Sequence, residues 1–185
     1  MKISLDTWKS VAPIFKGQIL SKYDSSTLVP PISDLQTKLN LAHKGFYIAV
    51  FDSTKKKIAR TGFLEDGQTD IINSANKVIA ALHLELETNK IFYAKLLTAV
   101  FNFVIVWDVV FLKNSLGWDE NEDGVHFQWG DEYKGLYLPY EIKQMKVPKT
   151  EVLNRLCSWE THVISNLWRL PEGRISRVVV DSFVI

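Results

Sequence analysis

The sequence has almost no cysteine and no excess of charge of either sign. Cys157 is the single cysteine among 185 residues, so no disulfide can form within the chain. Lys and Arg number 22 against 21 Asp and Glu, and this balance of +1 gives no general attraction to nucleic acid or anionic lipid. We therefore predict no nucleic-acid partner. The chain also lacks a leading basic and apolar signal segment, so we expect a cytoplasmic protein.

Long hydrophobic runs and cofactor motifs are also missing. The longest apolar run, residues 99–112, is interrupted by Asn102 and Asp108 and is shorter than the roughly 20 residues of a membrane-spanning helix. There is no glycine-rich phosphate loop, no paired-cysteine spacing and no nucleophile elbow. The acidic loop at residues 114–123 does not follow the spacing of a calcium-binding loop. These absences predict a soluble protein with no membrane contact, no cofactor and no metal.

What is present is the composition of an ordinary folded protein. The hydrophobic fraction is 46% and the charged fraction 23%, both close to the average for globular domains. A chain of 185 residues is long enough to bury a sizeable core and short for two independent ones. We therefore expect one domain, with one or two lobes.

The first half of the chain predicts two helices and a β-hairpin. Apolar residues from Trp8 to Ile19 recur at helical spacing, and Pro13 implies either that this helix begins near Ser10 or that it kinks there. Residues 45–63 read as two strands joined by a polar turn at residues 52–57. The clearest helix follows at residues 69–85, where isoleucine, alanine, valine and leucine form a single stripe.

The second half predicts a strand at residues 100–112, a hairpin at 124–138, a helix from Pro148 and a final strand at 175–184. The helices and strands are mixed along the chain, and the predicted fold class is α+β. Asp108 is the unusual residue, because a carboxylate within an apolar run must face solvent, find a partner or shift its pKa upward. It marks either an exposed bend or a buried acid at a cleft.

The order of elements from Gly124 onward resembles the AMMECR domain family, named for a human chromosomal region linked to Alport syndrome, midface hypoplasia and elliptocytosis. A glycine-flanked hairpin runs into a Gly-x-x-Leu-Pro element, a helix ends in Leu-Cys, and a tryptophan precedes the last strand. The matching residues here are Gly135, Leu138, Pro139, Leu156, Cys157 and Trp168. The resemblance covers roughly residues 10–185 and rests on order and spacing.

The chain also departs from the family pattern at its most distinctive motif. The family's Leu-Arg-Gly-Cys-Ile-Gly should fall near residues 58–63, where this chain reads IARTGF and has no cysteine. Only Arg60 and Gly62 resemble that motif, and neither aligns without a shift. The glutamine that often follows Leu-Pro in the family is replaced by Tyr140. The chain is therefore expected to be either a divergent member or a protein that kept the fold while changing the site, and no catalytic role of the family's cysteine carries over.

The resemblance implies a single two-lobed domain. The larger lobe, about residues 1–63 and 122–185, would hold both termini on an antiparallel sheet with helices, and the last strand would join the sheet of the first hairpin. A smaller α/β lobe would be inserted at about residues 64–121. The cleft between the lobes is the suspected site, although the biochemical activity of the family is undefined.

Two functions compete for that cleft. The first is a module that binds a small-molecule ligand or a protein partner, in keeping with the lost cysteine motif and with six tryptophans that could act either as interface anchors or as core. The second is an enzyme with general acid–base residues. Arg60 would hold an anion, His126 would act as base, and Asp108 or Asp131 would orient it. Alternatively, His126 is only an exposed residue on the polar face of a hairpin strand.

Overall fold

The computed structural model describes residues 3–27, 29–39 and 42–185 of the chain. Helices and antiparallel strands are mixed, which confirms the predicted α+β class. The strands are β1 (His43–Phe51), β2 (Lys57–Thr69), β3 (Val100–Phe111), β4 (Asp123–Trp129), β5 (Tyr133–Tyr137) and β6 (Gly173–Val184). They neighbour one another in the order β2-β1-β3-β6-β4-β5. The last strand thus joins the sheet of the first hairpin, as predicted.

The described residues also form six α-helices and two short helices of other types. They are α1 (Leu5–Leu20), α2 (Asp34–Lys38), α3 (Ile71–Thr88), α4 (Tyr93–Leu97), α5 (Pro139–Met145), α6 (Lys149–Arg155), the π-helix η1 (Leu156–Glu160) and the 3-10 helix η2 (Leu167–Arg169), all within the described ranges. The chain divides into two compact units. Unit 1 is Met1–Trp107 with Asp181–Ile185, and unit 2 is Asp108–Val180.

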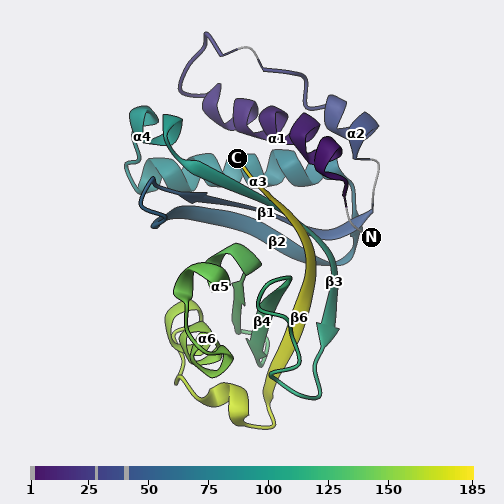
Figure 1. The fold of residues 1–185 in the computed structure, drawn as a ribbon, viewed down its shortest axis with the longest axis vertical. Helices are drawn as coiled ribbons and strands as arrows, with labels where there is room; N and C mark the ends of the chain where they lie inside the picture. Colours follow the sequence, from purple (N-terminus) through teal and green to yellow (C-terminus); the bar gives the residue numbers. More distant parts are fainter. Residues whose placement is uncertain (1–2, 28, 40–41) are drawn as a thin grey trace. The chain divides into compact units, whose positions relative to one another are not determined.

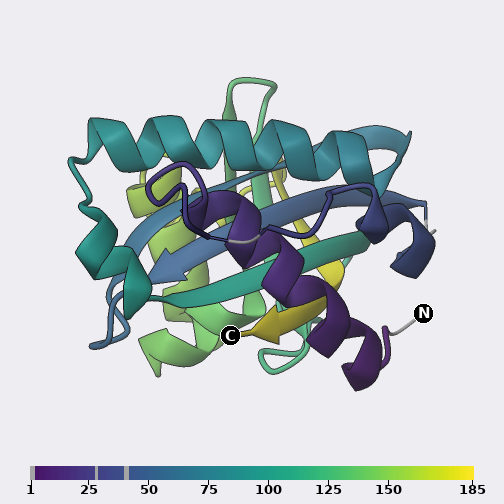
Figure 2. The same cartoon turned by 90° about the horizontal axis from the view of Figure 1, so that it is seen from above.

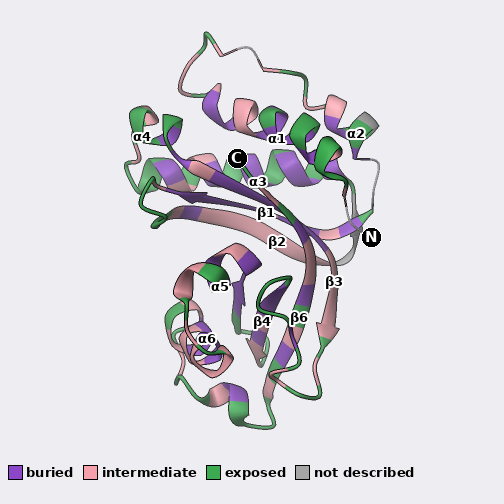
Figure 3. Ribbon diagram, in the orientation of Figure 1, coloured by how far each residue is buried: buried purple, intermediate pink, exposed green. Residues whose placement is uncertain are grey.

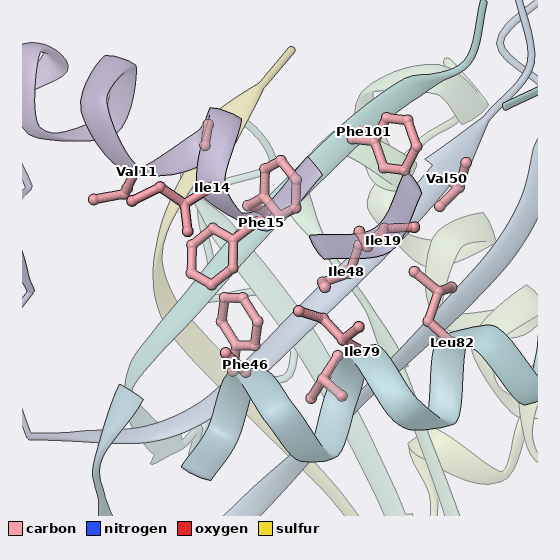
Figure 4. Packing of buried hydrophobic residues seen from close by; sticks show 14 of the residues in the cluster. Val11, Ile14, Phe15, Ile19, Phe46, Ile48, Val50, Ile79, Leu82 and Phe101 are labelled. Atoms are coloured by element: carbon pink, nitrogen blue, oxygen red, sulfur yellow. The ribbon is translucent and has the colours of Figure 1, made fainter. Parts of the chain in front are cut away.

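In unit 1, α1 and α3 lie on one face of the strands β1, β2 and β3 (Figures 1 and 2). The apolar stripes of both helices are buried, and exposed residues follow their opposite sides (Figure 3). Phe15 of α1 lies in this core near Phe46 of β1 (Figure 4), with 4.9 Å between their ring centroids. Its ring centroid lies 5.1 Å from that of Phe103 of β3. Alternation along the strands sends every second side chain toward the helices.

The expectation that α1 begins near Ser10 is wrong. The helix begins at Leu5, and Pro13 lies inside it. Ser4 caps the first turn by accepting a hydrogen bond from the backbone N–H of Thr7 at 3.1 Å. Burial of the stripe that includes Trp8, on the N-terminal side of Pro13, offsets the cost of a proline within the helix.

Unit 2 packs a β-hairpin against short helices. Strands β4 and β5 pair antiparallel, and their inward side chains share a core with α5, α6 and η1. Gly135 makes this packing possible, because a Cβ atom there would lie 2.7 Å from Cγ2 of Thr161. Helix α6 begins directly after Pro148, as predicted.

The bounds of the two units differ from those expected for the lobes. The predicted insertion, residues 64–121, would include the helix α3. In the structure, the apolar stripe of α3, including Val78 and Leu82, is buried in the same core cluster as Phe46 of β1. A helix that shares one core with the first hairpin belongs to the same unit, so the second unit begins at Asp108 instead.

Candidate functional site

A row of three residues crosses the strands of unit 1 on the face opposite its helices. Ala49 of β1 pairs with Arg60 of β2 on one side and with Asn102 of β3 on the other. We call Arg60, Ala49 and Asn102 the polar row. The neighbours of Ala49 along β1, Ile48 and Val50, belong to the helix-side core. Because side chains alternate along a strand, the polar row lies on the other face.

Asn102 is the most unusual residue of the polar row. Its exposed fraction is 0%, and among the described residues neither its Nδ2 nor its Oδ1 has a hydrogen-bond partner. Leaving a buried donor or acceptor unsatisfied costs about 1–3 kcal/mol. Native proteins therefore pair nearly all such groups, and each exception requires a physical explanation.

Aromatic residues lie on both sides of Ala49 along β1. Tyr47 and Phe51 are two positions away in either direction and share its face. Phe51 is buried and Tyr47 half-buried. A Cβ atom at Gly62 would lie 2.2 Å from Cδ1 of Tyr47, so the tyrosine ring lies over Gly62 of the neighbouring strand. Two rings thus border the polar row.

Arg60, which the sequence suggested as an anion holder, is half-buried within β2. Its backbone N–H donates to Oε1 of Glu85 in α3 at 3.2 Å. Burial is the main cause that raises the pKa of the Glu85 carboxyl, and hydrogen bonding to Arg60 opposes it. The contact joins β2 to α3 at this position, and the positive charge of Arg60 also lowers the pKa of Glu85.

The other candidate residues, Asp108, His126 and Asp131, belong to unit 2. Asp108 is half-buried within β3, and its Oδ1 accepts a hydrogen bond from the backbone N–H of Val109 at 2.9 Å. It therefore lies in a continuing strand and not at an exposed bend. Asp131 is exposed in the turn between β4 and β5.

His126 lies on β4, between Leu136 of β5 and Ser176 of β6. It is half-buried, and burial is the main cause that lowers its pKa to about 4, assisted by the positive charge of Lys134. Its imidazole is neutral at pH 7. A general base works best with a pKa close to the working pH, so a value of about 4 makes His126 a weak one.

Cys157 is a poor nucleophile. Burial raises the pKa of its thiol to about 11, so the thiol stays protonated at neutral pH. Its backbone carbonyl accepts from Oγ1 of Thr161 at 2.6 Å, which closes the turn after η1. Among the described residues, Cys157 and Trp168 lie in the core of unit 2, and the indole N–H of Trp168 donates to Oδ1 of Asn154 at 2.9 Å. These two residues of the family resemblance therefore have structural roles.

Two hollows lie in unit 2 beside the acidic loop at residues 114–123. One, of about 530 Å³, is lined by that loop together with Lys149 and Arg177. The other, of about 360 Å³, is lined by Glu120, Asn121 and the segment from Ile142 to Pro148. Both volumes fall in the range of small-ligand sites, which are mostly apolar. The lining of the larger hollow is mainly charged and polar, and that of the smaller hollow is about equally polar and apolar.

Lys149 organises the larger hollow. Its Nζ donates to the backbone carbonyl of Leu116 at 3.3 Å and to that of Trp118, and it lies 5.1 Å from the centre of the Trp118 ring. The indole N–H of Trp118 in turn donates to the carbonyl of Ser115 at 3.1 Å. The lysine therefore holds the loop in place, and its donors are directed at the loop and not at a ligand.

The sequence indicated only part of the candidate site. Arg60 was a candidate from the start, and Asn102 stood out as a polar break in an apolar run. Nothing in the sequence placed the two in one row, because their registers to β1 depend on strand pairing between segments about 40 residues apart in the chain.

Neither a metal-binding cluster nor a membrane-spanning helix is found in the described parts of the chain. No group of three or more His, Cys, Asp and Glu side chains within them is arranged to hold a metal ion. None of the helices they contain has the length and apolar character needed to cross a membrane.

Comparison with known proteins gives a structural relative. No family model and no curated protein matches the sequence. The fold is similar to that of the crystal structure of uncharacterized protein PH0010 from Pyrococcus horikoshii, with a TM-score of 0.76 over 98% of this chain and 93% of that one. The two sequences are 14% identical over this alignment. The chain therefore shares the α+β fold of that protein.

Proposed function

We propose that the chain is a divergent AMMECR-like binding module that holds a small molecule at the polar row of unit 1. The observation that carries this proposal is the fully buried carboxamide of Asn102, which has no partner among the described residues. The presence of such an unpaired group, which costs stability, is explained most simply by a hydrogen-bond partner that is not part of the chain.

The polar row has the composition of a binding site. Ligand sites are lined mainly by apolar and aromatic side chains with a few polar groups that fix orientation. Here the small side chain of Ala49 lies between Arg60 and Asn102, and Tyr47 and Phe51 border it along β1. The larger hollow of unit 2 fits this description less well, because charged side chains make up most of its lining.

The AMMECR-like part of the proposal rests on the sequence order from Gly124 to the last strand. In the structure the residues that carry it pack unit 2: Gly135 permits the contact with Thr161, and Pro139 starts α5, where the Glu141 carboxylate accepts from the Leu138 backbone N–H at 3.0 Å. They support a shared architecture. The expected cleft between two lobes stays a prediction.

The alternative, an enzyme with His126 as base, is supported less well. A base with a pKa of about 4 is a weak proton acceptor at neutral pH. Asp131, one of the two suggested orienting carboxylates, is exposed in a turn. The polar row requires neither residue.

Native mass spectrometry of the full chain purified from cells tests the binding proposal. We expect a fraction of the wild-type protein to carry a bound small molecule that remains under gentle ionisation and disappears on denaturation. The Asn102→Leu variant, which keeps the side-chain shape and removes both polar atoms, should lose this added mass. Ala49→Val, which adds bulk between Arg60 and Asn102, should reduce it.

A matched control distinguishes the polar row from the hollows of unit 2. Asn121 lines both hollows and is exposed, so Asn121→Leu makes the same chemical change at the competing location. Loss of the bound mass in Asn121→Leu, with retention in Asn102→Leu, would place the ligand in unit 2. Absence of any bound mass in the wild-type protein, after purification without dialysis, would contradict the proposal.

A further inference from the structure

We propose that the smaller hollow of unit 2 binds a free α-amino acid with an aliphatic side chain. This site is separate from the polar row of unit 1, so the inference goes beyond the proposed function and does not depend on it. The hollow has a volume of about 360 Å³, which lies at the lower end of the range for small-ligand sites and leaves room for a ligand of this size.

The apolar part of the hollow comes from the end of α5 and the turn that follows it. Ile142 belongs to the core of unit 2 and is 5% exposed, so the core holds it in place where it lines the hollow. Lys146 ends α5 in the left-handed conformation, and the chain then turns so that Val147 and Pro148 line the same hollow. Together they present an apolar surface that an aliphatic side chain would contact.

Charged groups of both signs border this apolar surface. Lys143 and Lys146 contribute ammonium groups, and Glu120 of the acidic loop contributes a carboxylate. Among the described residues, none of these three side chains takes part in an ion pair or a side-chain hydrogen bond. The hollow therefore carries opposite charges that do not pair with each other, and each is available to a ligand.

This arrangement of charges selects a zwitterion. The α-carboxylate of an amino acid would pair with the two ammonium groups, and its α-ammonium group would pair with Glu120. A simple carboxylic acid would leave Glu120 without a partner, and a dicarboxylic acid would bring a second negative charge close to it. The side-chain amide of Asn121 adds a further donor and acceptor to the lining.

The backbone conformation of Lys146 supplies a matched control. Its φ is 50° and its ψ 42°, a region that glycine adopts freely and other residues adopt at a cost. The chain nevertheless has lysine here, and the lysine side chain lines the hollow. Lys90 also has a positive φ, of 53°, but lines neither hollow of unit 2. The two lysines therefore share the backbone strain and differ in the proposed contact.

The test is a titration of the full ¹⁵N-labelled chain with L-leucine at low salt. It is followed by NMR through the backbone amides of Ile142, Lys143 and Val147 and the side-chain amide of Asn121. The charged groups are exposed, so we expect weak binding in fast exchange, seen as signals that move gradually.

Two further probes each lack one charge of leucine. 4-Methylpentanoate has the same aliphatic group and the carboxylate but no ammonium group, and leucinamide has no carboxylate. We expect leucine to bind about threefold more tightly than 4-methylpentanoate, which is the gain that one exposed ion pair gives. Leucinamide should leave the signals unmoved, because its positive charge would meet the two lysines.

Two variants separate the contributions of the two charges. Glu120→Gln should remove the advantage of leucine over 4-methylpentanoate and keep the binding of 4-methylpentanoate. Lys146→Gly should weaken the binding of both by about threefold, and yet raise the midpoint of thermal unfolding, because glycine relieves the backbone strain. Lys90→Gly should also raise the midpoint and leave binding unchanged. A raised midpoint in both variants shows that any loss of binding is not a loss of folding.

Three results would overturn the proposal. Equal affinities of leucine and 4-methylpentanoate for the wild-type protein would show that the ammonium group is not recognised. Equal losses of binding in Lys90→Gly and Lys146→Gly would show that only the general charge of the protein matters. Signals that leucine does not move, up to its solubility limit, would show that the hollow is solvated surface. The bound mass that depends on Asn102 is unaffected by each of these results, so the proposed function is tested separately.

Discussion

The indole N–H of Trp107 donates a hydrogen bond to Oδ2 of Asp181 at 3.1 Å, and the same oxygen accepts from the backbone N–H of Ile3 at 2.5 Å. One carboxylate of the last strand therefore joins the end of the β3 segment of unit 1 to the start of the described chain. Asp181 is buried, so each of these hydrogen bonds is protected from competition by water.

Removal of this carboxylate should destabilise the protein. We expect Asp181→Ala to lower the free energy of unfolding by about 1–3 kcal/mol, because it leaves two donors without their acceptor. Urea denaturation measures the change. Trp107→Phe removes one donor and should cost less. If Trp107→Phe costs as much in the Asp181→Ala background as in the wild type, the two residues are not coupled.

Asn102→Leu should stabilise the ligand-free protein. The buried carboxamide has no partner among the described residues, so replacing it with an apolar side chain of similar shape removes a desolvation cost of about 1–3 kcal/mol. The measurement is urea unfolding of protein refolded without small molecules. Asn102→Asp is the contrasting variant and should destabilise, because it buries a charge. A large loss of stability in Asn102→Leu would show that the amide is satisfied within the chain.

Gly135→Ala should strain the core of unit 2. Its Cβ would lie 2.7 Å from Cγ2 of Thr161 and 3.1 Å from Cδ1 of Leu156. Overpacking of this kind costs about 1–3 kcal/mol. Adding Thr161→Ser removes the nearest methyl group and keeps the hydroxyl that bonds to the Cys157 carbonyl. The double variant should recover part of the lost stability in thermal unfolding, and additive losses would argue against the contact.

His126 should make stability depend on pH. Its pKa is lowered from 6.5 to about 4 in the folded protein, so the unfolded chain binds more protons between these values. The contribution is fully present above pH 6.5 and is lost as the pH falls toward 4, by on the order of 3 kcal/mol in total. Urea midpoints at pH 7, 5.5 and 4.5, compared between the wild type and His126→Gln, measure it. Parallel pH profiles of the two proteins would contradict this assignment.

Lys149→Met should loosen the acidic loop. The variant keeps the apolar stem but removes the hydrogen bonds to the carbonyls of Leu116 and Trp118. We expect amide hydrogen exchange across residues 114–123 to accelerate about tenfold, while exchange in α3 is unchanged. Lys143→Met is the control, because Lys143 is exposed and lines only the smaller hollow. Equal effects of the two variants would contradict a specific role for Lys149.

The elements of the fold could be predicted where one physical signal dominated. The apolar stripe of α3 predicted a helix because its residues are spaced to be buried on one face. The β-branched residues of β3 predicted a strand because their rotamer preferences disfavour a helix. A start of α1 near Ser10 was one of two alternatives suggested by Pro13, and it is wrong because the packing of Trp8 and its neighbours extends the helix back to Leu5. The polar row could not be predicted, because register is a property of paired strands and not of either strand alone.

The contact between Tyr47 and Gly62 should restrict which residues can occupy these two positions in related sequences. Because the tyrosine ring occupies the space that any side chain at position 62 would need, the two positions cannot drift independently. We expect relatives that keep an aromatic residue at position 47 to keep glycine at 62, and those that have lost the glycine to carry a smaller residue at 47. The two positions would then covary, and this covariation would indicate the pairing of β1 with β2 from an alignment of sequences.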